Sequence, residues 1–363
     1  MPQTRRLATG RVHDLFTKNV LCRPHVFARQ NARMTFPEDI RTQLKGRRAV
    51  VTGGTGMIGR EVVRLLIEAG CTAVSVSLDR LIAHPEAEHI YGDLSDLKLC
   101  LDITKGADYV FHVAGIKGSV AVTKEKPASF FVPLLMMNTN LLEAARRNGA
   151  QRVLYTSSIG AYQSAEIFRE DETDFGKPPM DMFPGWAKRM AELQIEAYRI
   201  QYGLENFAIV RPSNVYGRGD NFDESNAMVI PTLMARVRRG DRPVLIWGDG
   251  SAVRDFLHAT DCARGMVLAC LRGTDGRPIN LGCGHGVTIK ELVQTLQRVA
   301  PFEAFFDASK PAGFPKRVMD GTKAKAKIGF EPKVSLFDGL KDTWEWFLKH
   351  ADEHDRKVNY FRS

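Results

Sequence analysis

The chain has 363 residues, of which 44% are hydrophobic, the composition of an ordinary globular protein of one large domain or two that share a cleft. No apolar stretch approaches the roughly 18 residues that a membrane-spanning helix needs, so we expect no membrane partner. The net charge is +9, but residues 1–48 hold eleven Lys/Arg and three acids and so carry +8 of it. Because the rest of the chain is nearly neutral, we expect no nucleic-acid partner.

The N-terminal residues 1–45 are predicted to be a basic, disordered extension. For residues 1–33 three interpretations stay open: an Arg-rich segment for import into an organelle, a disordered arm, or translation from an upstream start with Met34 as the true initiator. Since residues 34–37 lead directly into the fold, we favour the second and third interpretations over import.

The next stretch, Val50–Gly59, takes an apolar strand into a glycine-rich turn, and residues 60–67 follow with helical apolar spacing. Gly53 permits the turn, Gly56 lets the backbone approach a pyrophosphate, and Gly59 lets helix and strand pack closely. The helix N-terminus offers N–H groups and a positive dipole end to phosphate. This context predicts a dinucleotide-binding loop rather than a structural turn. The expected cofactor contacts here are Gly53, Thr55, Gly56, Met57, Ile58 and Gly59.

Residues 72–78 read as a second strand that ends at Asp79, 26 residues beyond Gly53. A carboxylate there accepts hydrogen bonds from the adenosine ribose hydroxyls, which favours NAD. Arg80 follows at once and could pair with a 2′-phosphate, so NADP stays open as the second cofactor.

Two further strand ends are predicted to meet the cofactor. A short strand closes at residues 91–94, which places Asp93 and Leu94 beside the adenine. Residues 109–115 form a buried strand that ends in small residues, where Ala114 lets the cofactor pass closely. We expect His112 in this strand to be a hydrogen-bonded structural histidine.

The later elements continue the alternation of strands and helices. Residues 128–148 are predicted as a helix that ends at a good C-cap, and residues 185–202 as another. Strands are expected at 152–156, leading into hydroxyl side chains, and at 206–212. The fold class is therefore α/β, a Rossmann-type doubly wound parallel sheet with helices on both faces. Residues 46–212 form its NAD(P)-binding domain, with ligands at the carboxyl ends of the strands.

From residue 213 the pattern loosens, and loops carry polar residues such as Asn221 and Asn226. We expect residues 213–363 to be mainly a smaller C-terminal substrate-binding region, interleaved with the first domain and closed by an amphipathic helix over 336–350. The six cysteines show neither a CxxC pair nor a metal-ligand spacing. We therefore predict no metal site and a reduced, cytoplasmic compartment.

Several motifs together resemble the extended short-chain dehydrogenases/reductases, the NAD-dependent epimerase/dehydratase family, over about residues 46–350. They are Thr52-Gly53-x-x-Gly56-x-x-Gly59, Asp93, His112–Gly115, Thr156-Ser157-Ser158, Lys188, Arg211–Gly217, Arg254-Asp255-Phe256 and Asn280–Gly282. Within this family the chain is most similar to the GDP-L-fucose synthase group, through residues 214–231, 247–251 and 254–258.

The resemblance implies a nucleoside-diphosphate sugar as the substrate. It implies that Ser158 and Lys188 are catalytic, that Lys188 also binds the nicotinamide ribose, and that Arg254 reaches the diphosphate. Asn214 and Trp247 would line the substrate site. It further implies a homodimer built through helices 128–148 and 186–202.

The sequence departs from the family pattern at its acid and base positions. The tyrosine expected four residues before Lys188 is Pro184, and a helix-borne asparagine is Leu134. The cysteine and histidine of the fucose-synthase group fall on Ile159 or Gly160 and on Met228. Possible substitutes are Lys117, Tyr162 and the acidic loop 166–181, although we expect the first to be solvated, the second to be packed and the acids to be solvent-exposed.

Two functional hypotheses follow. In the first, the chain is an NAD(P)-dependent epimerase, reductase or dehydratase of a nucleotide sugar, GDP-linked and with a 4-keto form among the candidates, that uses an atypical acid/base set. In the second, it is a catalytically degenerate module that binds NAD(P) as a sensor or as the partner of an active homologue. Arg254, Asn214 and Trp247 favour the first, and the losses at Pro184 and Met228 favour the second.

Overall fold

The computed structural model describes residues 36–116, 118, 120–350, 353, 356 and 357. The three hypotheses on residues 1–33 thus concern a part of the chain outside the described residues. The predicted end of the extension at residue 45 is wrong, because Glu38–Leu44 form helix α1. Ile40 and Leu44 are fully buried and Leu44 accepts a hydrogen bond from the Cys71 thiol, so these residues belong to the fold.

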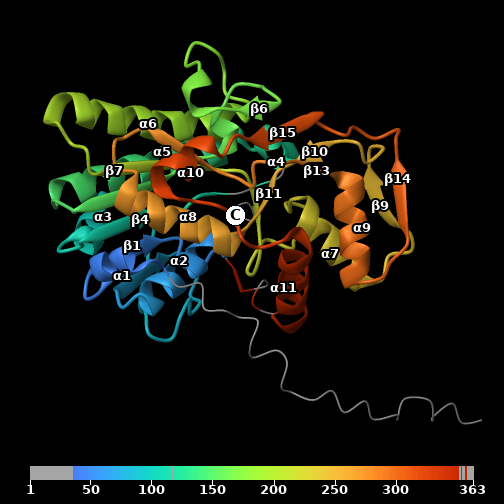
Figure 1. Cartoon of the computed structure of the whole chain (residues 1–363), viewed down its shortest axis with the longest axis horizontal. Helices are drawn as coiled ribbons and strands as arrows, with labels where there is room; N and C mark the ends of the chain where they lie inside the picture. The colour runs from blue at the N-terminus through green and yellow to red at the C-terminus, as the bar shows by residue number, and fades with distance from the viewer. Residues whose placement is uncertain (1–35, 117, 119, 351–352, 354–355, 358–363) are drawn as a thin grey trace, which may run out of the picture. The chain divides into compact units, whose positions relative to one another are not determined.

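Seven parallel strands form the central sheet, in the order β12-β7-β5-β4-β1-β2-β3. Figure 1 labels β7, β4 and β1 of this sheet. Their bounds are β1 Arg48–Thr52, β2 Thr72–Ser77, β3 Glu88–Tyr91, β4 Tyr109–His112, β5 Arg152–Thr156, β7 Phe207–Pro212 and β12 Pro278–Leu281. The chain runs outward from β1 to β3 and then returns to β4 on the other side of β1. The carboxyl ends of β1 and β4 therefore flank the crevice in which such sheets bind ligands. This confirms the predicted doubly wound sheet.

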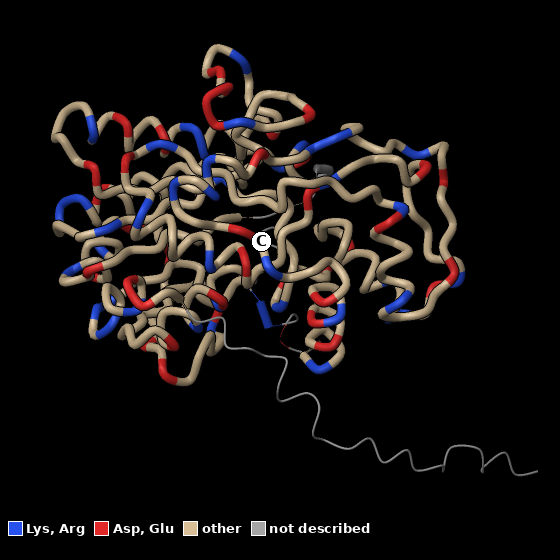
Figure 2. Tube along the Cα trace, viewed as in Figure 1, with Lys and Arg blue, Asp and Glu red and all other residues tan. Residues whose placement is uncertain are grey.

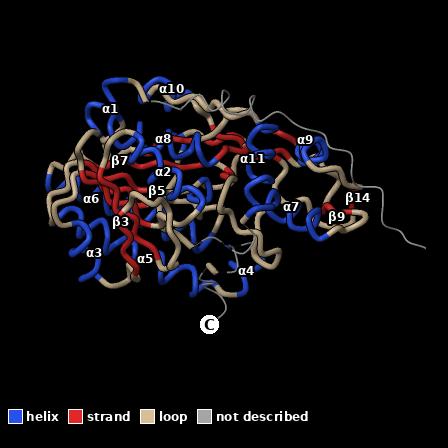
Figure 3. The backbone as a smooth tube through the Cα atoms, turned by 90° about the horizontal axis from the view of Figure 1, so that it is seen from below, coloured by secondary structure: helices blue, strands red, loops and turns tan. Residues whose placement is uncertain are grey.

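Helices cover both faces of this sheet (Figure 3). Helices α2 (Met57–Glu68) and α8 (Ala259–Arg272) pack together on one face. Helices α3 (Leu97–Thr104), α5 (Pro127–Arg147) and α6 (Met182–Tyr202) pack on the other, over a core of aliphatic side chains from sheet and helices. Since α8 and β12 come from the region after residue 213, that region is interleaved with the first domain.

The remaining elements build the smaller lobe and its connections. Its helices α7, α9 and α11 share a core in which the Phe222 and Phe347 rings stack 3.9 Å apart. The bounds are α4 Val120–Glu125, β6 Ile167–Phe168, β8 Asn214–Tyr216, α7 Val229–Arg239, β9 Val244–Trp247, β10 Val253–Arg254, β11 Phe256–His258, β13 Val287–Thr288, α9 Ile289–Val299, β14 Ala304–Asp307, β15 Lys316–Met319, α10 Thr322–Ile328 and α11 Leu336–Lys349. Short 3₁₀ helices span Ile159–Ala161 and Glu170–Glu172.

Basic and acidic residues are interspersed along the described trace (Figure 2). Within the described ranges, no helix is both long and apolar enough to cross a bilayer. In the same part of the chain, no group of three or more His, Cys, Asp or Glu side chains is arranged to hold a metal ion.

Candidate functional site

The turn between β1 and α2 requires glycine at two positions. Gly53 has a φ of +68°, and a Cβ on it would lie 2.8 Å from the Cα of Ala114. A Cβ on Gly59 would lie 2.0 Å from the carbonyl oxygen of Gly53. The predicted roles of Gly53 in permitting the turn and of Gly59 in allowing close packing are therefore confirmed. Because no side chain of the described residues caps the N-terminus of α2, its first N–H groups are available to a phosphate.

Asp79 lies at the carboxyl end of β2, where the glycine-rich turn fixes it. Its carboxylate accepts a hydrogen bond from Thr55 Oγ1 at 3.1 Å. Lys357 reaches the same region and donates to the carbonyl oxygen of Gly219, while Arg60 pairs with Glu353. Burial and then the neighbouring Arg60 charge lower the pKa of Lys357 to about 8. The carboxylate of Asp79 and the ammonium of Lys357 therefore lie near each other at the predicted position of the adenosine ribose.

One cavity of about 1050 Å³ joins the carboxyl ends of the central strands. Ligand pockets usually span roughly 300–1,000 Å³, so this one suits an extended ligand. The predicted cofactor residues that line it are Gly53, Thr55, Gly56, Met57, Ile58, Gly59, Asp79, Asp93, Leu94, Ala114 and Lys188, and Ser158 lines it as well. Arg80, Asn214, Trp247 and Arg254 are not among its lining residues. The glycine-rich turn, the uncapped N-terminus of α2 and the carboxylate of Asp79 together fit a dinucleotide.

His112 is the last residue of β4, which ends three residues before the predicted end of the strand. Its Nδ1 lies 2.8 Å from Thr52 Oγ1 and its Nε2 2.9 Å from Asn138 Oδ1. Burial, assisted by the charge of Lys188, lowers the pKa of His112 to about 3. The prediction of a structural histidine is confirmed, since the ring is neutral and both of its nitrogens are hydrogen-bonded.

Lys188 enters the cavity from α6. Its Nζ donates to the carbonyl oxygen of Thr156 at 2.7 Å and lies 5.3 Å from the centre of the Tyr155 ring. Burial lowers the pKa of Lys188 to about 8, and the carboxylate of Glu192 offsets only part of that shift. A cation that can exchange its proton near neutral pH therefore lines the same cavity as Ser158.

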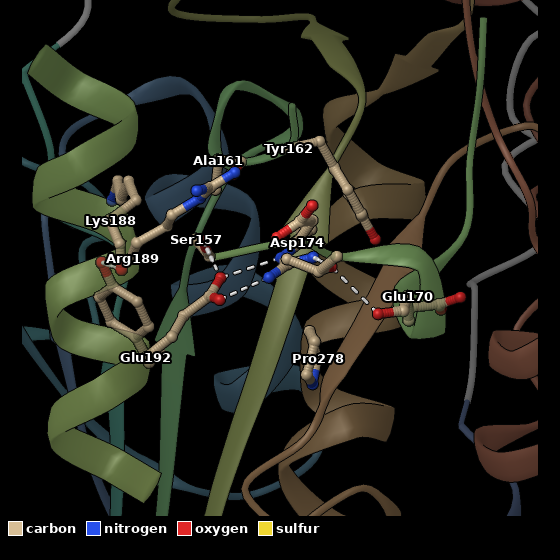
Figure 4. A network of polar contacts seen from close by, with 12 residues as sticks. Ser157, Ala161, Tyr162, Glu170, Asp174, Lys188, Arg189, Glu192 and Pro278 are labelled. Atoms are coloured by element: carbon tan, nitrogen blue, oxygen red, sulfur yellow. Dashed lines mark hydrogen bonds and ion pairs between the residues drawn. The ribbon is translucent and has the colours of Figure 1, made fainter. Parts of the chain in front are cut away.

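A buried polar network holds the strand end that carries the two serines (Figure 4). Ser157 Oγ donates to Glu192 at 2.5 Å, and Arg211 donates to the same carboxylate through Nε and Nη2. Ser157 is thus used structurally. Ser158 Oγ accepts from the backbone N–H of Gly160 at 3.0 Å, which leaves its O–H to donate to a ligand in the cavity.

The positions where the family resemblance implies proton-handling or polar groups hold apolar side chains. Pro184 lies in the first turn of α6, where a proline is tolerated. Its neighbour Phe183 packs edge-on against Phe131, with ring centres 6.0 Å apart. Leu134 is buried in the core, and Met228 is the N-cap residue of α7. None of these side chains can exchange a proton.

The proposed substitutes differ in their surroundings. Tyr162 is packed, as predicted: its hydroxyl donates to Asn280 Oδ1 at 2.8 Å, and burial raises its pKa. Lys117 lies outside the described residues. The expectation of exposed acids is wrong for Glu170 and Asp181, which are partly buried. Glu170 accepts the backbone N–H of Asn280 at 2.8 Å, whereas Asp181 Oδ2 lies over Gly160.

Arg254 and Arg317 form a pair of which the sequence predicted only Arg254. They are register partners on the adjacent parallel strands β10 and β15. Burial and the neighbouring Arg317 charge lower the pKa of Arg254 to about 10. The buried Nε of Arg317 has no hydrogen-bond partner in the part of the chain that the structure describes. Two like charges side by side, one of them with an unpartnered buried N–H among the described residues, favour an anionic ligand.

The other two predicted substrate residues lie apart from the cavity. Asn214 Nδ2 donates to the carbonyl oxygen of Asp255 at 3.0 Å and so helps to hold β8 beside β11. Trp247 ends β9 with 58% of its surface exposed. Their substrate roles stay predictions.

Sequence reasoning missed several lining residues, above all Lys357, Gly219 and Phe222. Lys357 lies about 300 residues from the glycine-rich turn in the chain, and no motif surrounds it. Asn221 and Asn226 were visible only as polar loop residues. Their contribution to the cavity depends on how the smaller lobe meets the sheet.

A profile described as the NAD dependent epimerase/dehydratase family matches residues 49–282. The chain belongs to this family. The chain is 32% identical over 327 residues to GDP-L-fucose synthase 1 of Arabidopsis thaliana, covering 85% of this chain and 95% of that protein. A dTDP-4-dehydro-6-deoxy-D-allose reductase from a Streptomyces species is 30% identical, with coverage of 84% and 97%.

Among solved structures, UDP-glucose 4-epimerase of Thermotoga maritima, determined with UDP-glucose, superimposes with a TM-score of 0.72 at 31% identity. The match covers 84% of this chain and 99% of that one. The chain is thus an NAD(P)-dependent enzyme of the epimerase, reductase and dehydratase class that acts on nucleotide sugars.

Proposed function

We propose that the enzyme reduces, epimerises or dehydrates a GDP-linked sugar, with a 4-keto sugar as the leading substrate. The shared cavity carries this proposal, because residues of the dinucleotide loop line it together with Ser158 and Lys188. The likeness to GDP-L-fucose synthase supports the GDP-linked substrate. The register pair Arg254 and Arg317 supports a diphosphate ligand, since guanidinium groups bind phosphate oxygens in a bidentate manner.

For the cofactor we propose NAD first and NADP second. The carboxylate of Asp79 suits the hydroxyls of an adenosine ribose, which favours NAD. Lys357 is close enough to Asp79 for their charges to interact, and Arg80 follows in the chain. These two cations keep NADP as the alternative, because a 2′-phosphate needs positive charge nearby.

The roles of the chain's own groups follow from their hydrogen bonds. The nicotinamide, when bound, supplies or accepts a hydride. Ser158 donates its O–H to the sugar oxygen at the reacting carbon, since its own oxygen already accepts from Gly160. Lys188 binds the nicotinamide ribose hydroxyls, and its charge stabilises negative charge that develops on the sugar oxygen.

The test separates cofactor binding from chemistry. The purified protein is denatured and any released nucleotide is identified by mass, and thermal unfolding is measured with NAD and with NADP. A ligand at 100 times its dissociation constant adds about 2.7 kcal/mol to the free energy of unfolding. A protein that neither cofactor stabilises would end the cofactor proposal.

Turnover is then followed by NMR in deuterated water with GDP-mannose, GDP-4-keto-6-deoxymannose and UDP-sugars. Product formation or deuterium exchange with a GDP-sugar supports the enzyme reading. Cofactor binding without turnover or exchange on any of these sugars would instead favour the non-catalytic binding module.

The assembly we propose is a homodimer through α5 and α6. These helices pack together, and each leaves large apolar side chains exposed: Val132, Met136, Met190 and Leu193. Such side chains on one helix pair favour burial against a second copy. The free thiols of Cys71, Cys100, Cys262, Cys270 and Cys283 support the cytoplasmic location predicted from the sequence.

A further inference from the structure

Asp181 is the N-cap residue of α6, but it does not cap the helix. An aspartate in this position normally accepts a hydrogen bond from a backbone N–H in the first turn. No such bond forms here. Instead the backbone N–H of Asp181 donates to the carbonyl oxygen of Gly160 at 3.2 Å, which ties the residue to the loop after Ser158.

The side chain of Asp181 occupies the space over Gly160. A Cβ on Gly160 would lie only 2.2 Å from Asp181 Oδ2, so the approach needs a glycine there. Ser158 contacts the same glycine, since its Oγ accepts the Gly160 N–H at 3.0 Å. The hydroxyl that lines the cavity and the carboxylate of Asp181 therefore lie at the same strand end.

The charged group that faces Asp181 is Arg317 on β15, which stands beside Arg254. Within the described residues, no hydrogen-bond donor contacts the Asp181 carboxylate. Burial raises its pKa, and the attraction to Arg317 opposes only part of that rise. A carboxyl group in this state stays protonated to a higher pH than an exposed one, as a proton donor requires.

The other titratable groups near the serines are already used. Lys188 donates to Thr156 and is assigned to the ribose, while Glu192 binds Arg211 and Ser157. Glu170 accepts the backbone N–H of Asn280. Among the described residues, Asp181 alone of these acids lacks a hydrogen-bond donor. Its Oδ2 lies over Gly160, whose N–H binds Ser158, and its charge interacts with that of Arg317.

We propose that Asp181 is the proton donor and acceptor of this enzyme, in place of the phenol that Pro184 cannot provide. The proposal rests on the proposed function. In the reducing direction, the carbonyl carbon of the sugar gains a hydride from the reduced nicotinamide as its oxygen takes the Asp181 proton. The C=O double bond becomes a C–OH group, the cofactor is left oxidised, and water returns a proton to the carboxylate.

The experiment compares Asp181→Asn with wild type in the NAD(P)H-dependent reduction of GDP-4-keto-6-deoxymannose. A positioned acid is worth roughly 10²- to 10⁴-fold, so we expect kcat to fall by that factor. KM and the dissociation constant for GDP-mannose should change less than about 3-fold, because the charge pair that binds diphosphate is intact. Asp171→Asn, at an exposed position of the same acidic loop, is the matched control and should keep its rate.

The pH profile separates a proton donor from a structural role. The wild-type rate should fall as the pH rises through the pKa of Asp181, and Asp181→Asn should lose that dependence. Asp181→Glu should have a higher rate than Asp181→Asn, because it keeps a carboxyl group. If Asp181→Asn does not fold, the rate and pH profile of Asp181→Glu are compared with those of wild type instead. An Asp181→Asn enzyme with more than a tenth of wild-type kcat would overturn the proposal. Wild type that binds cofactor and GDP-mannose without turnover would instead overturn the proposed function.

Discussion

Lys188 donates a hydrogen bond to the carbonyl oxygen of Thr156 at 2.7 Å, and the residue one helical turn before it is Pro184. The cation of the site is therefore held in place without the hydroxyl that would relay a proton. The glycines of the turn after β1 and the carboxylate of Asp79 line the part of the cavity where we propose that the dinucleotide binds. The site thus keeps the residues predicted to hold the cofactor but lacks the tyrosine that the family resemblance implies.

A phenol at position 184 should rescue an enzyme that lacks its proton donor. In the Asp181→Asn background, we expect Pro184→Tyr to raise the reduction rate by roughly 10²-fold or more. The ammonium of Lys188 would lower the pKa of the new phenol and so activate it. The rate is measured from the loss of NAD(P)H absorbance. Pro184→Phe adds the same ring without the hydroxyl, and an equal gain with both variants would refute the explanation.

The packing of α2 on the turn should make Gly59 intolerant of a side chain. Its added Cβ would meet the Gly53 carbonyl oxygen at 2.0 Å, so Gly59→Ala must push the helix away. We expect a loss of about 1–3 kcal/mol in the free energy of unfolding and no stabilisation by NAD. Gly321→Ala is the control, because nothing lies within 4 Å of its Cβ. Equal melting temperatures for both variants would contradict this account.

Lys188 should impose a specific pH dependence on stability. Burial lowers its pKa from 10.5 to about 8, so between these values the unfolded chain binds a proton that the folded protein has lost. The free energy of unfolding of wild type should therefore rise relative to that of Lys188→Met across this window. Urea unfolding at about pH 7 and about pH 10 measures both proteins. Lys357 titrates in both proteins, so its contribution cancels from the comparison. A difference in the free energy of unfolding that does not change with pH would exclude a lowered pKa of Lys188.

The Arg254–Arg317 pair should lower the stability of the ligand-free protein and raise its affinity for a diphosphate. Arg254→Gln removes a charge that Arg317 repels, so the ligand-free protein should melt at the same or a higher temperature. The affinity for GDP-mannose should fall roughly 10- to 100-fold, the value of a charged hydrogen bond. Calorimetry measures the affinity, and Arg277→Gln at an exposed position is the control. Unchanged affinity would remove Arg254 from the diphosphate site.

The proposed dimer predicts that a charge on α6 will dissociate it. Leu193 is 42% exposed on this helix, and Leu193→Arg would bury a charge in the interface without a partner. Light scattering should show a monomer for this variant and a dimer for wild type. Leu348→Arg on α11, where the leucine is 50% exposed, should leave the dimer intact. A wild-type monomer would contradict the proposal.

The sequence by itself determined the doubly wound sheet, the glycine-rich turn and the cofactor end of the cavity. These features depend on local patterns: apolar strands, helical spacing, and glycines at positions where a Cβ would collide with the backbone. The same local reading placed Asp79, Ser158 and Lys188 at strand ends or on the helix beside them. The sequence also showed that the tyrosine expected four residues before Lys188 is replaced by Pro184, whose side chain cannot exchange a proton.

Only the tertiary structure decided which polar groups stand together. Arg317 meets Arg254 through pairing of strands that lie more than 60 residues apart, and Lys357 meets the glycine-rich turn from the far end of the chain. In the sequence, Asp181 is one of several acids in a loop. Only the fold places its carboxylate over Gly160. Burial, and with it the pKa of each such group, depends on neighbours from distant segments, and a single sequence does not encode those neighbours in any local pattern.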